Sequence, residues 1–403
     1  MSSSQTIIIA GAGIGGLTAA LALVSRGLRV RLLEQATRLE EPGAGLQLSP
    51  NATRVLIALG LAERLRPRAV APEAVRVRKA GNGRDLALLP VGRTQHYYGA
   101  PYWVIHRGDL QAALLAAVTD HADIAVELGT RVQIFAAHPK GVMVGYLRKS
   151  ETGDATGIGF VGADGLWSAI RACLGEKSPP RPAGRTAWRA LVPADAVPAE
   201  FREPVVYLWV GPEGHLVHYP VRAGGAINIV AITTDAWAGT GWSTRSDRDE
   251  LLARFSRKDW AEPARALLAT PNQWLKWALY DRPPLHRWGR GATTLLGDAA
   301  HPMLPFLAQG AAMAIEDAAV LAHALTRVPG GTATAMRHYE NQRRARTARV
   351  QAAARLNGRV YHLGGPAALI RDLAMRTILG SELVLRRYDW IYDWRPPGRA
   401  AGS

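Results

Sequence analysis

The feature that most constrains this chain is a glycine-rich turn near its start. The turn, Gly11-Ala12-Gly13-Ile14-Gly15-Gly16, follows the β-branched run Thr6–Ala10 and precedes residues 17–26, which are typical of a helix. Residues 30–33 then form a second apolar run that ends at Glu34. A strand, a glycine-rich turn, a helix and a second strand in close succession predict a β–α–β unit, and therefore a parallel sheet with helices on its faces.

This turn has the residue types that a dinucleotide requires. Gly11 allows a tight turn, Gly13 lets the backbone approach a pyrophosphate, and Gly16 lets the helix pack on the strand. The helix N-terminus attracts negative charge, and Glu34 can accept a hydrogen bond from a ribose hydroxyl. The pattern predicts NAD or the ADP half of FAD, because a carboxylate at Glu34 disfavours the 2′-phosphate of NADP. Neighbouring positions included in the predicted site are Ile14, Gly15 and Gln35.

Two later segments bear on which dinucleotide binds. Residues 158–161 are strand-like and lead into Gly162-Ala163-Asp164-Gly165, and a buried strand at 293–296 leads into residues 297–302. Asp298 in the second segment can accept from polyol hydroxyls, although taken alone it could equally cap a turn. A helix that begins at residues 310–312 can stabilise negative charge on a reduced ring.

Together with His106-Arg107-Gly108-Asp109-Leu110, these motifs make the chain resemble the single-component FAD-dependent aromatic hydroxylases, the class A flavoprotein monooxygenases. Within that class it most resembles the salicylate hydroxylase branch. The likeness covers about residues 5–350 in the expected order. It implies an α/β fold: a Rossmann-like FAD-binding domain of the GR2, p-hydroxybenzoate hydroxylase-like type, with an inserted β-sheet substrate domain and C-terminal helices.

The resemblance and the local patterns imply three parts. Residues 1–74, 101–180 and 276–330 would form a discontinuous FAD-binding domain, residues 75–100 and 181–275 a β-rich substrate domain, and residues 331–403 a C-terminal helical segment. A hairpin around Gly81-Asn82-Gly83 and β-rich runs at 205–210, 215–221 and 226–233 support the inserted sheet. Helices are expected at 49–64, 247–257, 263–269, 310–325 and 333–356.

The resemblance also implies roles for individual residues. The ADP half of FAD would lie on Gly11, Gly13, Gly16 and Glu34. Gln47 would lie near the flavin, Arg107 would contact the cofactor, and Asp298 would bind the ribityl chain. Asp164 belongs to a motif linked to the FAD pyrophosphate and to NAD(P)H, which would act as a transient co-substrate. The residues expected to line the isoalloxazine ring are Pro302, Gly310, Ala311 and Ala312.

Residues 214–220 carry the candidate catalytic side chains. On a strand, His215, Val217 and Tyr219 share one face, whereas His218 points the other way. Electrophilic hydroxylation is faster when the aromatic ring carries a phenolate, which calls for a nearby base or hydrogen-bonding group. We expect His215 to act as base or orienting group and Tyr219 as a hydrogen-bond partner of the substrate. The alternative is an exposed His215 and a Tyr219 that only packs in the core.

The implied reaction is hydroxylation of a small aromatic acid, salicylate- or hydroxybenzoate-like, with NAD(P)H and O2 through a flavin C4a-hydroperoxide. One alternative is an activity like that of the 6-hydroxynicotinate 3-monooxygenases, although some relatives place an acid/base His where this chain has Gln47. Another is a monooxygenase or epoxidase of a larger hydrophobic or quinone-type substrate. A non-catalytic basic scaffold is a third. NADH or NADPH, the ring position and an accompanying decarboxylation stay open.

Composition limits the partners. The net charge is +16, but 43 of the 49 basic residues are Arg spread over the whole chain, so neither a nucleic-acid nor a membrane partner is expected. The arginines of residues 337–359 are expected on a solvated helix or at a subunit contact, in a monomer or homodimer. The single cysteine, Cys173, expected to be buried, excludes an intramolecular disulfide and a Cys-based metal site; no metal is expected, and the cytoplasm is the expected compartment.

Overall fold

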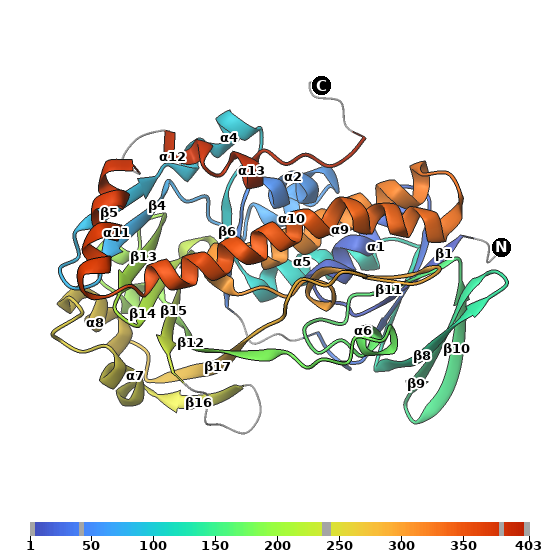
Figure 1. Ribbon diagram of the computed structural model, residues 1–403, viewed down its shortest axis with the longest axis horizontal. Helices are drawn as coiled ribbons and strands as arrows, with labels where there is room; N and C mark the ends of the chain where they lie inside the picture. Colours follow the sequence, from blue (N-terminus) through green and yellow to red (C-terminus); the bar gives the residue numbers. More distant parts are fainter. Residues whose placement is uncertain (1–4, 40–43, 236–242, 379–382, 399–403) are drawn as a thin grey trace.

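The parallel sheet predicted from the glycine-rich turn is present and has five strands in the order β18-β11-β1-β2-β7. The computed structural model describes residues 5–39, 44–235, 243–378 and 383–398, so the expected domain limits at residues 1 and 403 lie outside it (Figure 1). All four strand pairs are parallel. The strands are β1 (Thr6–Ala10), β2 (Arg29–Glu34), β7 (Ile124–Leu128), β11 (Gly159–Gly162) and β18 (Thr293–Leu295).

Three helices rich in alanine and leucine pack together beside this sheet. They are α1 (Ile14–Val24), α5 (Arg107–Thr119) and α9 (Gly310–Arg327). Both α5 and α9 lie against α1. Helix α1 is buried on nearly every side, which explains why its sequence is almost continuously apolar.

The inserted β-rich part is a single eight-stranded sheet in the order β16-β17-β12-β15-β14-β13-β4-β5. Neighbouring strands are antiparallel except for the parallel pair β13–β4. The sheet continues past residue 275, the expected end of the substrate domain, as far as Asp281. Its strands are β4 (Ala74–Lys79), β5 (Asp85–Leu89), β12 (Arg181–Pro193), β13 (Val205–Gly211), β14 (Gly214–Val221), β15 (Ala226–Thr234), β16 (Ser243–Asp247) and β17 (Gln273–Asp281).

One face of the eight-stranded sheet is covered by α7 (Arg248–Arg254) and α8 (Glu262–Ala269), as Figure 1 shows. Leu251 and Leu267 of these helices belong to the same buried core as Trp188 and Trp209 of the sheet. The two helices predicted here are therefore confirmed, and they provide the second layer that lets large aromatic side chains be buried on this face.

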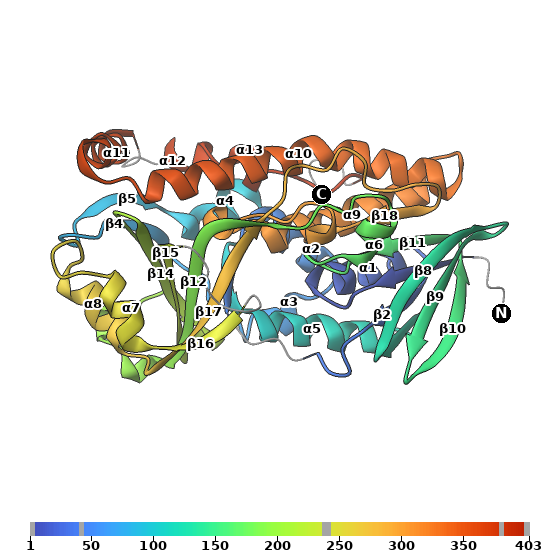
Figure 2. The same cartoon turned by 60° about the horizontal axis from the view of Figure 1, so that its bottom comes forward.

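Two smaller sheets were not predicted. Strands β8 (Thr130–His138), β9 (Gly141–Arg148) and β10 (Glu151–Gly157) form an antiparallel sheet at one end of the molecule (Figure 2). Strands β3 (Gly45–Leu48) and β6 (Trp103–His106) pair between the two large sheets. The strand β10, with the sequence ETGDATG, is mostly exposed and has no apolar run to reveal it.

The C-terminal segment is helical, as expected. Helix α10 (Gly331–Tyr361) runs along the molecule from the end with the parallel sheet to the end with the eight-stranded sheet (Figures 1 and 2). It is followed by α11 (Gly365–Ile378), α12 (Leu383–Arg386) and α13 (Asp389–Tyr392). The expectation that the arginines of this segment face solvent is wrong for Arg343, which is 1% exposed and bound to Glu316 and Asp317 of α9.

Several local predictions need correction. The helix expected at 49–64 is two helices, α2 (Pro50–Ala58) and α3 (Ala62–Leu65), because the chain turns at Gly60. Cys173, at the end of α6 (Ala169–Cys173), is exposed rather than buried. The other short helices are α4 (Thr94–Tyr98), η1 (Val91–Arg93), η2 (Ala194–Ala196), η3 (Ala199–Phe201), η4 (Arg222–Gly224), η5 (Gly297–Ala299) and η6 (Pro305–Leu307). Within the described ranges, no helix is both long and apolar enough to cross a membrane.

Candidate active site

The glycine-rich turn joins β1 to α1 with a geometry that only glycine allows at two positions. Gly11 has a φ of +105°, and a Cβ there would lie 2.4 Å from the carbonyl oxygen of Ala163. A Cβ on Gly16 would lie 1.9 Å from the carbonyl oxygen of Gly11. A Cβ on Gly13, in contrast, would meet no atom within 4 Å. Gly11 and Gly16 therefore shape the turn, whereas the missing side chain of Gly13 leaves space open above the helix N-terminus.

Glu34, at the end of β2, holds the same turn from the neighbouring strand. Its Oε2 accepts a hydrogen bond from the backbone N–H of Ala12 at 2.7 Å, and its Oε1 accepts one from Ala36 at 2.8 Å. A carboxylate has lone pairs for further donors, so these bonds leave capacity for a ribose hydroxyl. The adjacent Gln35 is exposed.

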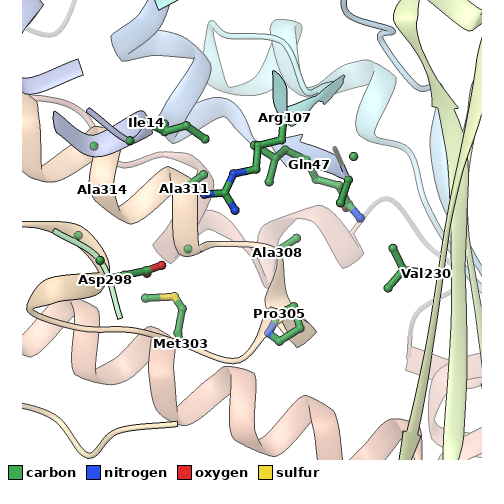
Figure 3. Close-up of a pocket in the computed structure, with 18 of the residues that line it drawn as sticks. Ile14, Gln47, Arg107, Val230, Asp298, Met303, Pro305, Ala308, Ala311 and Ala314 are labelled. Carbon is green, nitrogen blue, oxygen red and sulfur yellow. The ribbon is translucent and has the colours of Figure 1, made fainter. Parts of the chain in front are cut away.

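A cavity of about 300 Å³ begins at this turn and extends to the eight-stranded sheet. Gly13, Ile14 and Gly15 line one end. Figure 3 shows Ile14 and Ala311 at this end and Val230, on the sheet, at the other. The cavity therefore connects the predicted dinucleotide turn with the predicted substrate strand, as a cofactor that joins the two would require.

The N-terminus of α9 also faces the cavity. Gly310, Ala311 and Ala314 line it, while Ala312 is buried behind them. The small side chains let the backbone N–H groups of the first turn come close to a ligand, and the helix dipole favours negative charge there.

Asp298 and Arg107 provide opposite charges along the cavity wall. Asp298 follows Gly297, which has a φ of +62°, and its carboxylate is reached by solvent through the cavity while surrounded by protein (Figure 3). Loss of hydration in this enclosed place raises the pKa of Asp298, and the charges of His301 and Arg107 oppose that rise. Both side chains are placed where a polyol and a phosphate could meet them.

Two predicted residues point away from the cavity. The carboxylate of Asp164 accepts hydrogen bonds from the hydroxyl of Ser168 at 2.5 Å and from the backbone N–H of Ile170 at 3.1 Å. It therefore holds the start of α6, and its neighbours Ala163 and Gly165 line the cavity instead. Pro302 is buried, and its carbonyl accepts from Gln351 at 2.7 Å. The cavity wall in that region consists of Met303 and Pro305.

The predicted shared face of β14 is confirmed. His215, Val217 and Tyr219 all line the cavity, and the strand β15 adds Val230 and Ile232. His218 points to the other face, where its ring stacks on Tyr207 with 4.7 Å between the ring centroids. The alternative of an exposed His215 is wrong, because its side chain is 3% exposed.

Gln47 connects the cavity to two tyrosines. Its Oε1 accepts the hydroxyl proton of Tyr102 at 2.6 Å, and its side chain opposes the rise in the pKa of Tyr219. Burial raises the pKa of Tyr219 well above its usual value, so its hydroxyl keeps its proton. Tyr219 lines the cavity, so its protonated hydroxyl can donate to a ligand there.

His215 is hydrogen-bonded to a residue that sequence analysis did not find. Its Nδ1 lies 2.6 Å from Nε2 of His362, the C-cap residue of α10. His362 Nδ1 in turn contacts Nη1 of Arg185 on β12 and lies 3.2 Å from the hydroxyl of Thr234. Burial, and to a lesser extent the charge of Arg185, lowers the pKa of His215 to about 3.

Arg189 is a third residue, after His362 and Arg185, that the sequence did not reveal. It lines the cavity from β12, beside Val230 in the sheet register. Its guanidinium carbon lies 4.6 Å from the centre of the Trp277 ring, which holds it in place through a cation–π contact. Strand alternation would have placed Arg189 on one face of β12, but only the pairing of β12 with β15 shows that this face is the cavity face.

The donor and acceptor set fits a flavin dinucleotide. The open backbone at Gly13 and the first turn of α9 provide N–H groups for anionic oxygens, Asp298 provides an acceptor for hydroxyls, and the space between them continues to the apolar sheet. In the part of the chain that the structure describes, no group of three or more His, Cys, Asp or Glu side chains could hold a metal ion.

Similarity to known proteins supports the fit to a flavin dinucleotide. The family described as FAD binding domain matches residues 4–354. A 3-hydroxybenzoate 6-hydroxylase of Klebsiella oxytoca is 37% identical over 397 residues, covering 98% of both chains. The 3-amino-4-hydroxybenzoate 2-monooxygenase PtmB3 of Streptomyces platensis is 38% identical over 396 residues, covering 96% of both.

Solved structures show the same similarity. Klebsiella pneumoniae HpxO complexed with FAD and uric acid matches with a TM-score of 0.84 and 26% identity, covering 96% of this chain and 97% of that one. A salicylate hydroxylase substrate complex matches with a TM-score of 0.81 and 25% identity, covering 98% and 96%. The fold and the cofactor expected from the sequence are thus confirmed, and the chain belongs to the family of FAD-dependent aromatic hydroxylases.

Proposed function

We propose that this enzyme hydroxylates a small aromatic acid of the hydroxybenzoate type, using FAD, NAD(P)H and O2. The observation that carries this proposal is the sheet end of the cavity, where one cationic side chain, Arg189, accompanies the polar groups of His215 and Tyr219 in an otherwise apolar wall. A hydroxybenzoate has the matching parts: a carboxylate, an apolar ring and a phenolic hydroxyl. The relatives named for 3-hydroxybenzoate and 3-amino-4-hydroxybenzoate support this substrate class.

Each part of such a substrate has a proposed partner. Arg189 would bind the carboxylate, because a guanidinium pairs with a carboxylate through two parallel hydrogen bonds. Val217, Val230 and Ile232 would contact the ring, and their burial against it contributes roughly 25 cal/mol per Å² of apolar surface covered. Tyr219 and His215 would then meet the phenolic oxygen, with His215 acting as a base or as an orienting group.

For the cofactor, we propose that the open backbone at Gly13 and Gly15 accommodates the pyrophosphate and that Glu34 binds the ribose of the ADP half. Asp298 would bind the ribityl hydroxyls, and Gly310 and Ala311 would lie along the flavin ring. When bound, FAD supplies the redox chemistry that activates O2 with electrons from NAD(P)H. The chain's own contribution is to hold the aromatic ring against that cofactor and to keep water from the apolar sheet wall.

The expected division of the chain is retained as part of the proposal, with one change. Because β17 belongs to the eight-stranded sheet, the substrate domain would comprise residues 75–100 and 181–281. The single cysteine continues to favour a reducing cytoplasm.

The test measures NADH and NADPH oxidation in air by FAD-loaded enzyme, without and with 3-hydroxybenzoate, salicylate, 3-amino-4-hydroxybenzoate or 6-hydroxynicotinate. We expect one hydroxybenzoate to stimulate oxidation and to yield a hydroxylated product that chromatography detects. Stimulation by 6-hydroxynicotinate alone, or by none of the four compounds while FAD stays bound, would overturn the substrate class.

Arg189 gives the test a residue-level control. Arg189→Met should raise the KM for the stimulating acid by about 10- to 150-fold, as expected for loss of a charge-assisted hydrogen bond. Arg189→Lys keeps the charge but cannot form two parallel hydrogen bonds to a carboxylate. Its KM should therefore lie between that of the unmodified enzyme and that of Arg189→Met. An unchanged KM in Arg189→Met would exclude Arg189 as the carboxylate partner.

A further inference from the structure

The three residues Arg185, His362 and His215 form a series of hydrogen-bonding groups that leads into the cavity from the end of β15, where Arg185 pairs with Thr234. Arg185 lies on β12, His362 is the C-cap residue of α10, and His215 lies on β14, so three separate elements contribute one group each. The backbone also holds His362 in place, because its carbonyl accepts a hydrogen bond from the N–H of Glu213 at 3.3 Å. This series of side-chain contacts determines which nitrogen of His215 carries a proton.

Which group donates and which accepts in this series follows from the chemistry of Arg185, its first member. A guanidinium can donate but cannot accept, so Nδ1 of His362 must be the acceptor where it contacts Arg185 Nη1. The Thr234 hydroxyl, 3.2 Å from the same nitrogen, accepts from Arg185 at 2.9 Å and can also direct its own proton at Nδ1. The proton of a neutral His362 therefore lies on Nε2.

The same reasoning applies to the next link. His362 Nε2–H donates across 2.6 Å to Nδ1 of His215, which must then be an acceptor. A neutral imidazole has one acceptor nitrogen and one N–H group, so the proton of His215 lies on Nε2, on the opposite edge of the ring. Nδ1 is occupied by His362, and Nε2 is the nitrogen that a ligand in the cavity would meet.

We infer that His215 meets the substrate as an N–H donor whose tautomer is fixed by Arg185 through His362, and not as the base that removes the phenolic proton. This inference rests on the proposed function, because it specifies what His215 does to a phenolic substrate. Arg185 and His362 are positioning residues, since neither lines the cavity in the described residues.

The second polar group on the same strand agrees with this assignment. Tyr219 lines the cavity and keeps its hydroxyl proton because burial raises its pKa, so Tyr219 can also donate to a ligand there. A neutral phenol oxygen can also accept, but two donors at one substrate oxygen stabilise the charged phenolate more than the neutral phenol. His215 and Tyr219 would thus select the ionised ring that electrophilic hydroxylation favours.

The groups around His215 also disfavour a role of His215 as a base. The titratable or charged groups that face it are Arg185 from β12 and His362 and Tyr361 from α10, and no carboxylate is among its described contacts. A proton transferred to His215 would create a buried cation beside the Arg185 guanidinium. With its pKa lowered to about 3, His215 would be a weak acceptor for the proton of a phenol, whose pKa is close to 10.

His362 offers a variant that separates the two roles. In His362→Gln, the amide oxygen can accept from Arg185 and the amide N–H can donate to His215, so the donor and acceptor roles along the series are preserved. An amide does not carry a proton onward, so a base that releases its proton through His362 would be disabled. His362→Leu removes both hydrogen bonds at similar volume.

The experiment measures the affinity of the oxidised FAD-loaded enzyme for 3-hydroxybenzoate between pH 6 and pH 10, from the change in flavin absorbance and without NAD(P)H. Donors that stabilise the phenolate lower the substrate's bound pKa, so affinity should rise as pH approaches the free phenol's pKa near 10. We expect His362→Gln to keep this rise and His362→Leu to weaken phenolate binding about 10- to 150-fold. Benzoate, which lacks the hydroxyl, should bind equally to all three proteins.

A second measurement does not depend on the substrate. Proton–nitrogen NMR of the histidine-labelled holoenzyme reports the tautomer of His215, assigned by its absence in His215→Asn. The expected result is Nε2–H from pH 5 to pH 9, and a proton on Nδ1 would overturn the inference. Equal loss of phenolate binding in His362→Gln and His362→Leu would also overturn it. If no hydroxybenzoate binds but Nε2–H is observed, the proposed substrate fails while the tautomer assignment stands.

Discussion

Replacing Gly13 by alanine should weaken FAD binding without weakening the fold. Gly13 precedes α1 with φ −70° and ψ −179°, a backbone conformation that alanine also adopts, and a Cβ there meets no atom within 4 Å. Alanine is a poorer helix cap than glycine by about 0.5–1 kcal/mol, but it also reduces the entropy of the unfolded chain by about 0.4–1 kcal/mol. The two effects oppose each other, so the free energy of unfolding should change by less than about 0.5 kcal/mol.

The effect on FAD arises from the direction of the new methyl group. Gly13 lines the cavity at the end where the pyrophosphate is expected, so the methyl occupies space that the phosphate needs. Forcing a methyl into a close-packed contact costs about 1–3 kcal/mol, which corresponds to a loss of FAD affinity of about 5- to 150-fold. Titration of apoprotein with FAD, followed by the quenching of flavin fluorescence, measures this loss directly.

Gly16→Ala is the matched control. Its Cβ would lie 1.9 Å from the carbonyl oxygen of Gly11, a backbone atom that cannot move away cheaply. We expect this variant to lose at least about 1–3 kcal/mol of unfolding free energy even without FAD, measured by urea unfolding of the apoprotein. If Gly13→Ala binds FAD as tightly as the unmodified protein, or unfolds as easily as Gly16→Ala, the assignment of the two glycines is refuted.

Three further changes test the surroundings of the site. Asp298→Asn should reduce FAD affinity by about 10- to 150-fold in the same titration, because an amide accepts fewer and weaker hydrogen bonds than a carboxylate; unchanged affinity would remove Asp298 from the ribityl site. Arg343→Met should cost about 3–5 kcal/mol of unfolding free energy, whereas Arg359→Met, on the exposed side of the same helix, should cost less than about 0.5 kcal/mol; equal losses would contradict the buried network. The charges of His301 and Arg343 outweigh burial and lower the pKa of Asp317 from 3.8 to about 2, so its contribution of about 2 kcal/mol is complete above pH 4 and is lost as pH falls toward 2. Asp317→Asn should therefore lose less stability than the unmodified protein between pH 5 and pH 3, and an unchanged pH dependence would show that Asp317 is not the group responsible.

Sequence alone located those parts of the site that depend on local backbone shape. The turn around Gly11 follows the buried strand β1, and the turn that carries Asp298 follows the buried strand β18, so in both places the motif and its geometry coincide. His215 and Tyr219 were found because strand alternation places them on one face and because the resembled family has a His and a Tyr at this spacing. What alternation cannot show is the partner across the sheet. Arg189 became visible only when β12 was seen to pair with β15, which places Arg189 beside Val230.

The residues that sequence missed share a physical reason. His362 and Arg185 lie 147 and 30 residues from His215 along the sequence, and the three meet because the long helix α10 ends beside strands β12 and β14. No local pattern marks such a contact. The antiparallel sheet that contains β10 was missed for a different reason: its exposed polar strand is stabilised by pairing with β9, and not by an apolar face of its own.

Helix α10 also stabilises the cofactor end of the cavity, although none of its residues lines that end. Asp317 Oδ2 accepts from the backbone N–H of Gly297 at 3.0 Å and is bound to His301 Nε2 at 2.6 Å, which fixes both ends of the turn that carries Asp298. Asp317 Oδ1 is in turn bound by Nε of Arg343 at 2.6 Å. A buried carboxylate without that cation would be costly, and its pKa would rise until it lost its charge. The arginine of α10 thus keeps Asp317 ionised, and an ionised Asp317 keeps the Asp298 turn in the shape that faces the cavity.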